Sequence, residues 1–262
     1  ASFPICIAAS ILRIKFIIYE NNLIIGKANN YLLPFSNKIF VSFKEVEGIS
    51  EKYKDKVIKI GNILKKEIIN FSQENFKTFQ NRRLNILVLG GSQAAKIFAE
   101  ILPNIFSKCS EYGFNLKIYQ HCLPDQSEKL KNFYEKKRID FETFNFSNNL
   151  IAYFAKINLA ITRSGSSILA ELTNANIPFI SVPLPTSADN HQLKNSIYYQ
   201  SKNLGLLVEE KNLNDKLFYH IKEIYNNKSI LNKIKQSQKQ HSDKNVYHNI
   251  DHELKKIIDE EN

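Results

Sequence analysis

Three polar loops of the sequence each follow an apolar run and precede a helix-like segment. The first, residues 90–93 (GGSQ), comes directly after the apolar run 84–89. Glycine allows the backbone to approach a ligand closely, and the N–H groups and dipole of a helix N-terminus favour phosphate. A plain strand-to-helix turn uses the same residues, so both interpretations stay open. The spacing is not G-x-G-x-x-G, which argues against an NAD site.

The second loop, residues 162–167 (TRSGSS), combines small and hydroxyl-bearing residues. Gly165 permits close approach, and Ser164 or Ser166 can cap the helix that follows. Glu171, on that helix, offers a carboxylate that can accept hydrogen bonds from two neighbouring hydroxyls, as on a ribose. Because the residues around Glu171 are apolar, the alternative is a solvated residue on an otherwise packed helix.

The third loop, residues 183–192 (PLPTSADNHQ), contains two prolines that set a rigid turn before a dense polar cluster. His191 and Gln192 could bond the hydroxyls of a sugar. In the alternative interpretation, Asp189 is only a helix N-cap and His191 faces solvent.

The elements around these loops alternate between strands and helices. We expect strands at residues 84–89, 116–120, 139–144, 157–162, 178–182 and 205–208, with helices at 94–108, 125–136, 148–155, 166–174 and 190–202 and more helices beyond. This βαβ alternation predicts an α/β fold with a doubly wound parallel sheet. Ligands of such folds bind at the carboxyl ends of the strands, where all three loops lie, so together they favour a nucleotide-containing ligand.

The chain divides by pattern into three parts. Residues 1–65 form a second, partial α/β unit with a helix at 4–12 and strands at 14–19, 38–43 and 57–60. Residues 66–242 form the ligand-binding domain, and 243–262 a C-terminal helix that could pack back toward the N-terminal domain. The apolar stretch 3–19 is interrupted by Arg13 and Lys15, so it is too short to span a membrane.

Composition limits the remaining function classes. The 262 residues carry a formal net charge of +10, which either reflects solvated helix faces or fits an anionic membrane surface. No RNP motif, zinc finger or compact arginine cluster is present, so we expect no nucleic-acid partner. The three cysteines show no C-x-x-C spacing, which indicates neither disulfides nor a zinc site and fits a reducing compartment.

Five motifs, in the right order and spacing, together resemble the family of MurG, the glycosyltransferase of the bacterial cell wall. They are GGSQ, RSGSSILAE, PLPTSADNHQLKN, residues 19–26 (YENNLIIG, against H-E-Q-N-x-x-x-G) and residues 61–65 (GNILK, against G-N-P-x-R). The match covers nearly the whole chain. It implies a GT-B fold of two Rossmann-like domains, of which we expect the N-terminal one to be truncated here.

The resemblance implies an inverting transfer of N-acetylglucosamine (GlcNAc) from UDP-GlcNAc to the muramoyl 4-hydroxyl of lipid I. The product would be lipid II, made for peptidoglycan synthesis without a required metal or cofactor. The implied location is peripheral, on the cytoplasmic face of the bacterial inner membrane. Two alternatives remain: another lipid-glycosylating GT-B enzyme, or an inactive fragment that binds a UDP-sugar.

Family membership implies a role for several residues of the larger domain. Ser92 would contact the donor diphosphate, and the backbone of Ser147 would meet the uracil edge. The segment from Ser166 to Glu171 would wrap the nucleotide, with Glu171 on the ribose hydroxyls.

The sugar end of the donor is assigned in the same way. Gln192, with His191 beside it, would bond the GlcNAc hydroxyls, and Asn22 would reach the sugar from the N-terminal side. Lys65 takes the place of the G-N-P-x-R arginine, keeping its charge but losing bidentate phosphate geometry.

The catalytic base is where this chain departs most from the family. Family members open with a G-G-T-G-G-H loop whose histidine is the proposed base, and no such loop occurs in this sequence. The absence of Met also leads us to expect a processed or truncated N-terminus. Because a base must lie within hydrogen-bond reach of the attacking hydroxyl, no catalytic residue can be named, and Glu20 is a weak substitute candidate.

Further departures are Tyr19 for a family histidine, Asn21 for a glutamine and Ala94 for a glycine. The family's membrane-facing apolar patch, ringed by basic residues, could persist at residues 11–16 (ILRIKF). For Ile14 and Phe16, however, we expect interior packing.

Overall fold

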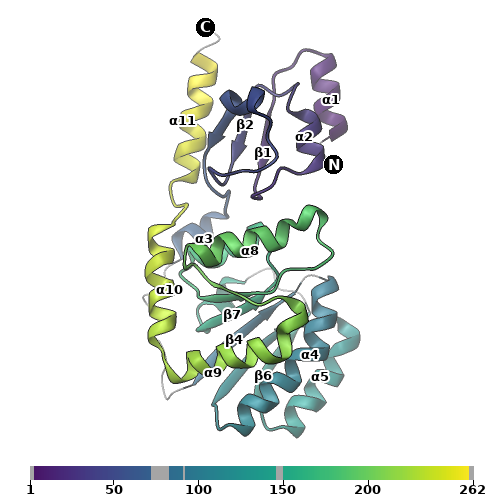
Figure 1. Ribbon diagram of the computed structural model, residues 1–262, viewed down its shortest axis with the longest axis vertical. Coiled ribbons are helices and arrows are strands. Elements are labelled where there is room, and N and C mark those ends of the chain that lie inside the picture. The colour runs from purple at the N-terminus through teal and green to yellow at the C-terminus, as the bar shows by residue number, and fades with distance from the viewer. Residues whose placement is uncertain (1–2, 72–82, 91, 146–149, 260–262) are drawn as a thin grey trace. The chain divides into compact units, whose positions relative to one another are not determined.

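The computed structural model describes residues 3–71, 83–90, 92–145 and 150–259 (Figure 1). The chain forms two compact units: residues 1–65 with 243–262 make up unit 1, and residues 66–242 make up unit 2.

Unit 2 is built on a six-stranded, fully parallel sheet. Its strand order is β6-β5-β4-β7-β8-β9, with the first strand of the unit, β4, at the centre. The strands are β4 (Leu84–Leu89), β5 (Leu116–His121), β6 (Asp140–Phe144), β7 (Leu159–Thr162), β8 (Phe179–Ser181) and β9 (Leu206–Leu207). The connections reverse direction between β4 and β7, and such a switch point leaves a crevice at the carboxyl ends of the strands.

Helices connect the strands of unit 2. They are α3 (Lys66–Asn70), α4 (Ser92–Glu111), α5 (Pro124–Lys136), α6 (Ile151–Phe154), α7 (Ser166–Asn174), α8 (His191–Ser201), α9 (Phe218–Asn226) and α10 (Ser229–Gln240). The helix α4 packs on α5 and α9, and α7 packs on α10. Figure 1 shows α4 and α5 side by side along the sheet.

Burial of apolar side chains from both sheet and helices explains this arrangement. The central strand β4 buries all of its residues except the partly buried Asn85, as the nearly continuous apolar run predicted. Phe98 of α4 and Ile161 of β7 belong to the same core cluster and are fully buried. At the edge of the sheet, a Cβ on Gly205 would lie 2.2 Å from the ring of Phe179, so the packing there requires glycine.

Unit 1 contains a three-stranded parallel sheet in the order β1-β2-β3. Its strands are β1 (Ile17–Glu20), β2 (Lys38–Val41) and β3 (Val57–Lys59), and its helices are α1 (Phe3–Ile11), α2 (Lys27–Leu32), a 3-10 helix (Glu51–Lys56) and α11 (Val246–Asp259). Polar contacts hold the start of α11 to the segment after β3. Asn62 Nδ2 donates to Asp243 Oδ2 at 2.8 Å, and Tyr247 Oη donates to the Leu64 carbonyl at 2.6 Å.

Some sequence expectations were wrong at the level of single elements. The first strand begins at Ile17 rather than residue 14, and Ile14 is 57% exposed instead of packing inside. Phe16 does pack against the core of unit 1. The short helix α2 and the 3-10 helix before β3 were not expected, because six polar-rich residues carry little helical periodicity.

Among the described residues, no helix combines the length and the apolar character that crossing a membrane would require.

Candidate nucleotide-binding site

A cavity of about 350 Å³ lies at the carboxyl ends of four neighbouring strands of unit 2. Residues that end or follow β4, β5, β6 and β7 line it, together with residues of α7 and α8: Leu89, Gly90, His121, Phe144, Leu150, Thr162, Arg163, Gly165, Ile168 and Gln192. It therefore occupies the switch point of the sheet, and all three predicted loops form parts of its wall, through Gly90, Gly165 and Gln192.

The first loop leads into the longest of the helices that the structure describes. Gly90 lines the cavity, and α4 begins at Ser92 and continues for 20 residues. The N-terminal N–H groups of such a helix have no partner within the helix, and its dipole favours an anion. This end of the cavity is suited to a diphosphate.

The second loop is fixed by side chains from α8. The backbone carbonyl of Ser164 accepts from Asn195 Nδ2 at 3.1 Å, and its hydroxyl is hydrogen-bonded to that of Ser196. Ser164 is fully buried, so its side chain serves the fold rather than a ligand. Gly165 is thereby left at the cavity surface with no side chain to obstruct a ligand.

Gln192 joins the second and third loops. Its Oε1 accepts from the backbone N–H of Ser164 at 3.2 Å and from that of Leu184 at 3.0 Å. With the oxygen engaged in this way, the side chain offers its Nε2 donors to a ligand in the cavity that it lines.

The turn before α8 has an uncommon backbone conformation. Asp189 and Asn190 both have positive φ, 51° and 54°, which non-glycine residues adopt at a cost in free energy. Asp189 lies within the turn instead of being the N-cap, a position that Asn190 takes. The Nδ1 of His191 lies 2.7 Å from the Ala188 carbonyl, to which it donates a hydrogen bond.

A buried ion pair between Arg163 and Glu210 fixes the strand ends next to the cavity. Arg163 donates to the carbonyls of Val182 and Pro183 at 3.3 and 3.2 Å, and its Nη2 lies 2.5 Å from Glu210 Oε2. The guanidinium also lies 5.0 Å from the ring centroid of Phe98. Arg163 thus ties the ends of β7 and β8 to the segment after β9.

Aromatic side chains form the wall at β5 and β6. The rings of Phe144 and Tyr153 stack at 4.5 Å, and the rings of His121 and Phe144 lie 5.8 Å apart. Tyr153 donates to Glu142 Oε1 at 3.0 Å. Burial, together with this bond to a carboxylate, raises the pKa of Tyr153 to about 12, so the phenol stays protonated.

The remaining predicted residues of unit 2 are not among the described residues that line this cavity. Ser166 is the buried first residue of α7, and Glu171 is half-buried on the same helix, which contributes Ile168 to the cavity. Ser92 begins α4. Ser147 lies outside the described residues.

Glu20 in unit 1 is a buried carboxylate with both oxygens occupied. Oε1 accepts from the backbone N–H and Nδ2 of Asn22 at 3.0 and 3.1 Å. Oε2 accepts from the backbone N–H of Gly26 at 2.9 Å and from Asn29 Nδ2 at 3.0 Å. Four donors around one carboxylate fix the loop between β1 and α2, and with it the position of Asn22.

Tyr19, at the family's histidine position, bonds within unit 1. Its hydroxyl lies 2.7 Å from Ser42 Oγ and accepts from the Ile63 N–H at 3.1 Å. Burial raises the pKa of Tyr19, so it stays a neutral phenol near pH 7. Lys65 is exposed two residues beyond Ile63, at the end of the first segment of this unit.

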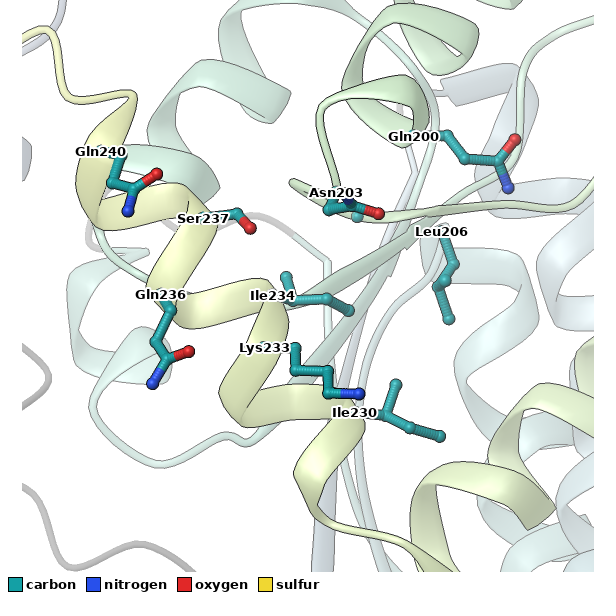
Figure 2. Close-up of a pocket in the computed structure, with 10 residues that line it drawn as sticks. Gln200, Asn203, Leu206, Ile230, Lys233, Ile234, Gln236, Ser237 and Gln240 are labelled. Atoms are coloured by element: carbon teal, nitrogen blue, oxygen red, sulfur yellow. The ribbon is translucent and has the colours of Figure 1, made fainter.

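A second cavity, of about 630 Å³, lies at the other end of the edge strand β9 (Figure 2). Side chains of α10, including Lys233, Ser237 and Gln240, face Gln200 and Asn203 across it. The lining of this second cavity includes Gly205, which precedes β9. The cavity therefore lies away from the carboxyl ends of the strands. None of the predicted binding residues lines it.

Comparison with known proteins agrees with this geometry. The family model of the glycosyltransferase family 28 C-terminal domain matches residues 85–250. A Pelagibacter ubique protein is 34% identical over 260 residues, which cover 99% of this chain and 72% of that protein. It is named UDP-N-acetylglucosamine--N-acetylmuramyl-(pentapeptide) pyrophosphoryl-undecaprenol N-acetylglucosamine transferase. The chain belongs to the MurG family of glycosyltransferases.

Two further matches support the family and the fold. A Rickettsia felis protein of the same name is 33% identical, with 86% of this chain and 64% of that protein aligned. The crystal structure of Acinetobacter baumannii MurG superposes with a TM-score of 0.77 at 21% identity, covering 95% of this chain and 69% of that one. The fold is therefore of the GT-B type, and the chain spans between about two thirds and three quarters of these relatives.

The MurG-family motifs contain half of the residues that line the cavity: Gly90, Arg163, Gly165, Ile168 and Gln192. Arg163 lies inside a recognised loop without a predicted role, and His121 and Phe144 could have been found only from their positions at strand ends. No motif or pattern in the sequence indicated a role for Glu210. No group of three or more possible metal ligands occurs in the described part of the chain.

Breaking the buried ion pair should destabilise unit 2. Glu210→Ala leaves the guanidinium of Arg163, which is 10% exposed, without its partner, at an expected cost of about 3 kcal/mol. Urea unfolding followed by circular dichroism measures this change in the free energy of unfolding.

The matched control is Glu209→Ala, which removes an exposed partner of Lys211 and should cost less than about 1 kcal/mol. Equal losses in the two variants would show that the buried pair does not hold these loops together.

Proposed function

We propose that this chain carries the donor site of an inverting transferase that moves GlcNAc from UDP-GlcNAc to the muramoyl 4-hydroxyl of lipid I. The product is lipid II, used in peptidoglycan synthesis. The observation that supports this most strongly is the 34% identity with the named Pelagibacter ubique transferase over 99% of the chain. The position of the cavity at the switch point of the sheet supports it independently.

The donor is held by loops and helix ends rather than by a charged cluster. The diphosphate lies at the start of α4, where Ser92 and the backbone N–H groups meet it. Glu171, with Ser166 at the start of the same helix, binds the ribose, and the backbone of Ser147 meets the uracil edge. Gln192, beside His191, donates to the GlcNAc hydroxyls.

Unit 1 supplies the acceptor side of the reaction. Asn22 contacts the donor sugar, and Lys65 supplies a positive charge for a phosphate. The four hydrogen bonds to Glu20 fix the loop that carries Asn22, so we assign Glu20 a positioning role. A carboxylate that already accepts four bonds has no free lone pair directed at an attacking hydroxyl, and we name no catalytic base.

A transfer assay tests the reaction. The protein, with every residue that its gene encodes, should move labelled GlcNAc from UDP-GlcNAc to lipid I and not to diacylglycerol. Chromatography of the lipid products measures both. Transfer to diacylglycerol but not to lipid I would contradict the proposed acceptor, whereas binding of UDP-GlcNAc without any transfer would leave only a nucleotide-sugar-binding role.

The role of Gln192 is tested by a substitution that preserves its structural bonds. Gln192→Glu keeps an oxygen for the N–H groups of Ser164 and Leu184 but removes the Nε2 donors. Losing one such bond should weaken UDP-GlcNAc binding about tenfold, and calorimetric titration measures it. The affinity for UDP, which lacks the sugar, should fall by a smaller factor. An equal loss for the two ligands would contradict the assignment of Gln192 to the sugar.

We also propose that α1 binds the cytoplasmic membrane surface. No residue of α1 is buried, and Ile5, Ile11 and Leu12 are exposed next to the basic Arg13 and Lys15. Apolar side chains at the end of a helix, flanked by positive charge, can insert between anionic lipid head groups.

Sedimentation with vesicles of phosphatidylethanolamine and phosphatidylglycerol tests this surface. Ile11→Glu combined with Leu12→Glu should lower the partition coefficient more than tenfold, because it removes two apolar side chains and adds two negative charges. Ile258→Glu, at an exposed position on α11 in the same unit, is the control. A similar loss in the control would show that α1 is not the binding surface.

A further inference from the structure

His121 has a buried polar atom that the fold does not use. It is the last residue of β5, and its side chain lines the 350 Å³ cavity. Its Nδ1 is buried and has no hydrogen-bond partner among the described residues. Buried polar atoms in native proteins are nearly always bonded, so an unpaired one in a cavity wall points to a ligand.

The surroundings of His121 are aromatic and rigid. Phe144 lies beside it, at 5.8 Å between ring centroids, and is itself stacked on Tyr153 at 4.5 Å and 21°. Tyr153 is anchored by its hydrogen bond to Glu142. Aromatic rings beside an unpaired nitrogen suit a planar heteroaromatic ring, which packs by its face or edge and needs a hydrogen bond at its rim.

The order of the strands indicates which part of a nucleotide reaches this wall. The anion-binding start of α4 follows β4, in the middle of the cavity. Gln192 lies on the β7 side, and His121 and Phe144 lie on the β5 and β6 side. A diphosphate at α4 that directs its sugar toward Gln192 leaves the β5 and β6 side of the cavity, where His121 and Phe144 lie, for the base.

We propose that His121 is a nucleotide-recognition residue, whose Nδ1 forms a hydrogen bond with the pyrimidine base while Phe144 packs against that base. The inference rests on the proposed UDP-sugar function and adds to it a side chain that none of the five sequence motifs contains. A neutral imidazole nitrogen can donate or accept, so Nδ1 can pair with either a carbonyl or the N3–H of uracil.

His121→Phe tests the role, because it keeps a planar ring of similar size and removes both nitrogens. Calorimetric titration with UDP should show binding about tenfold weaker than that of the unchanged protein. The unfolding temperature without ligand should stay the same or rise, because a buried unpaired polar atom has been replaced by an apolar one. A purely structural histidine would give the opposite pattern, with lower stability and unchanged affinity.

Two more variants complete the experiment. His121→Gln restores polar atoms at this position and should recover part of the affinity for UDP. His248→Phe, at an exposed position on α11, should leave it unchanged. If the unchanged protein binds UDP and His121→Phe binds it equally well, the role of His121 is refuted while the proposed function stands. If the unchanged protein does not bind UDP, both are refuted.

Discussion

Much of unit 2 depends on one buried guanidinium. Arg163 bonds the carbonyls of Val182 and Pro183 and pairs with Glu210, so three segments that are distant in sequence meet at a single side chain. A buried charge is tolerated only where it is paired and hydrogen-bonded. Every loop that Arg163 contacts is therefore held in place, and these loops carry Gly165 and lead to Gln192 at the cavity.

Glu20 has the corresponding role in unit 1 with the opposite charge. Its carboxylate accepts three hydrogen bonds from the loop between β1 and α2 and a fourth from Asn29 of α2. In both units the buried charge organises backbone, whereas the wall of the cavity in unit 2 offers main-chain N–H groups and the amide of Gln192. Neutral donors placed at helix ends can bind a diphosphate without the cost of burying further cations.

Exposed lysines on helices account for much of the positive charge of the chain. Lysines pair with acidic residues one turn away on exposed helical surfaces, as in Lys54 with Glu51, Lys131 with Glu135 and Lys255 with Asp251. Such pairs contribute little stability each and keep the surface solvated. This arrangement favours the interpretation of the charge as solvated helix faces for most of the molecule.

The sequence by itself determined the parallel α/β fold and the family. Apolar runs such as 84–89, separated by helix-length segments, allow few arrangements, and the loops at Gly90 and Gly165 follow strands directly, so their place at one edge of the sheet follows from chain direction alone. The roles of Arg163, Glu210 and His121 were decided by tertiary structure. Each depends on partners from other strands, and the side-chain contacts between such segments are set only when the core packs.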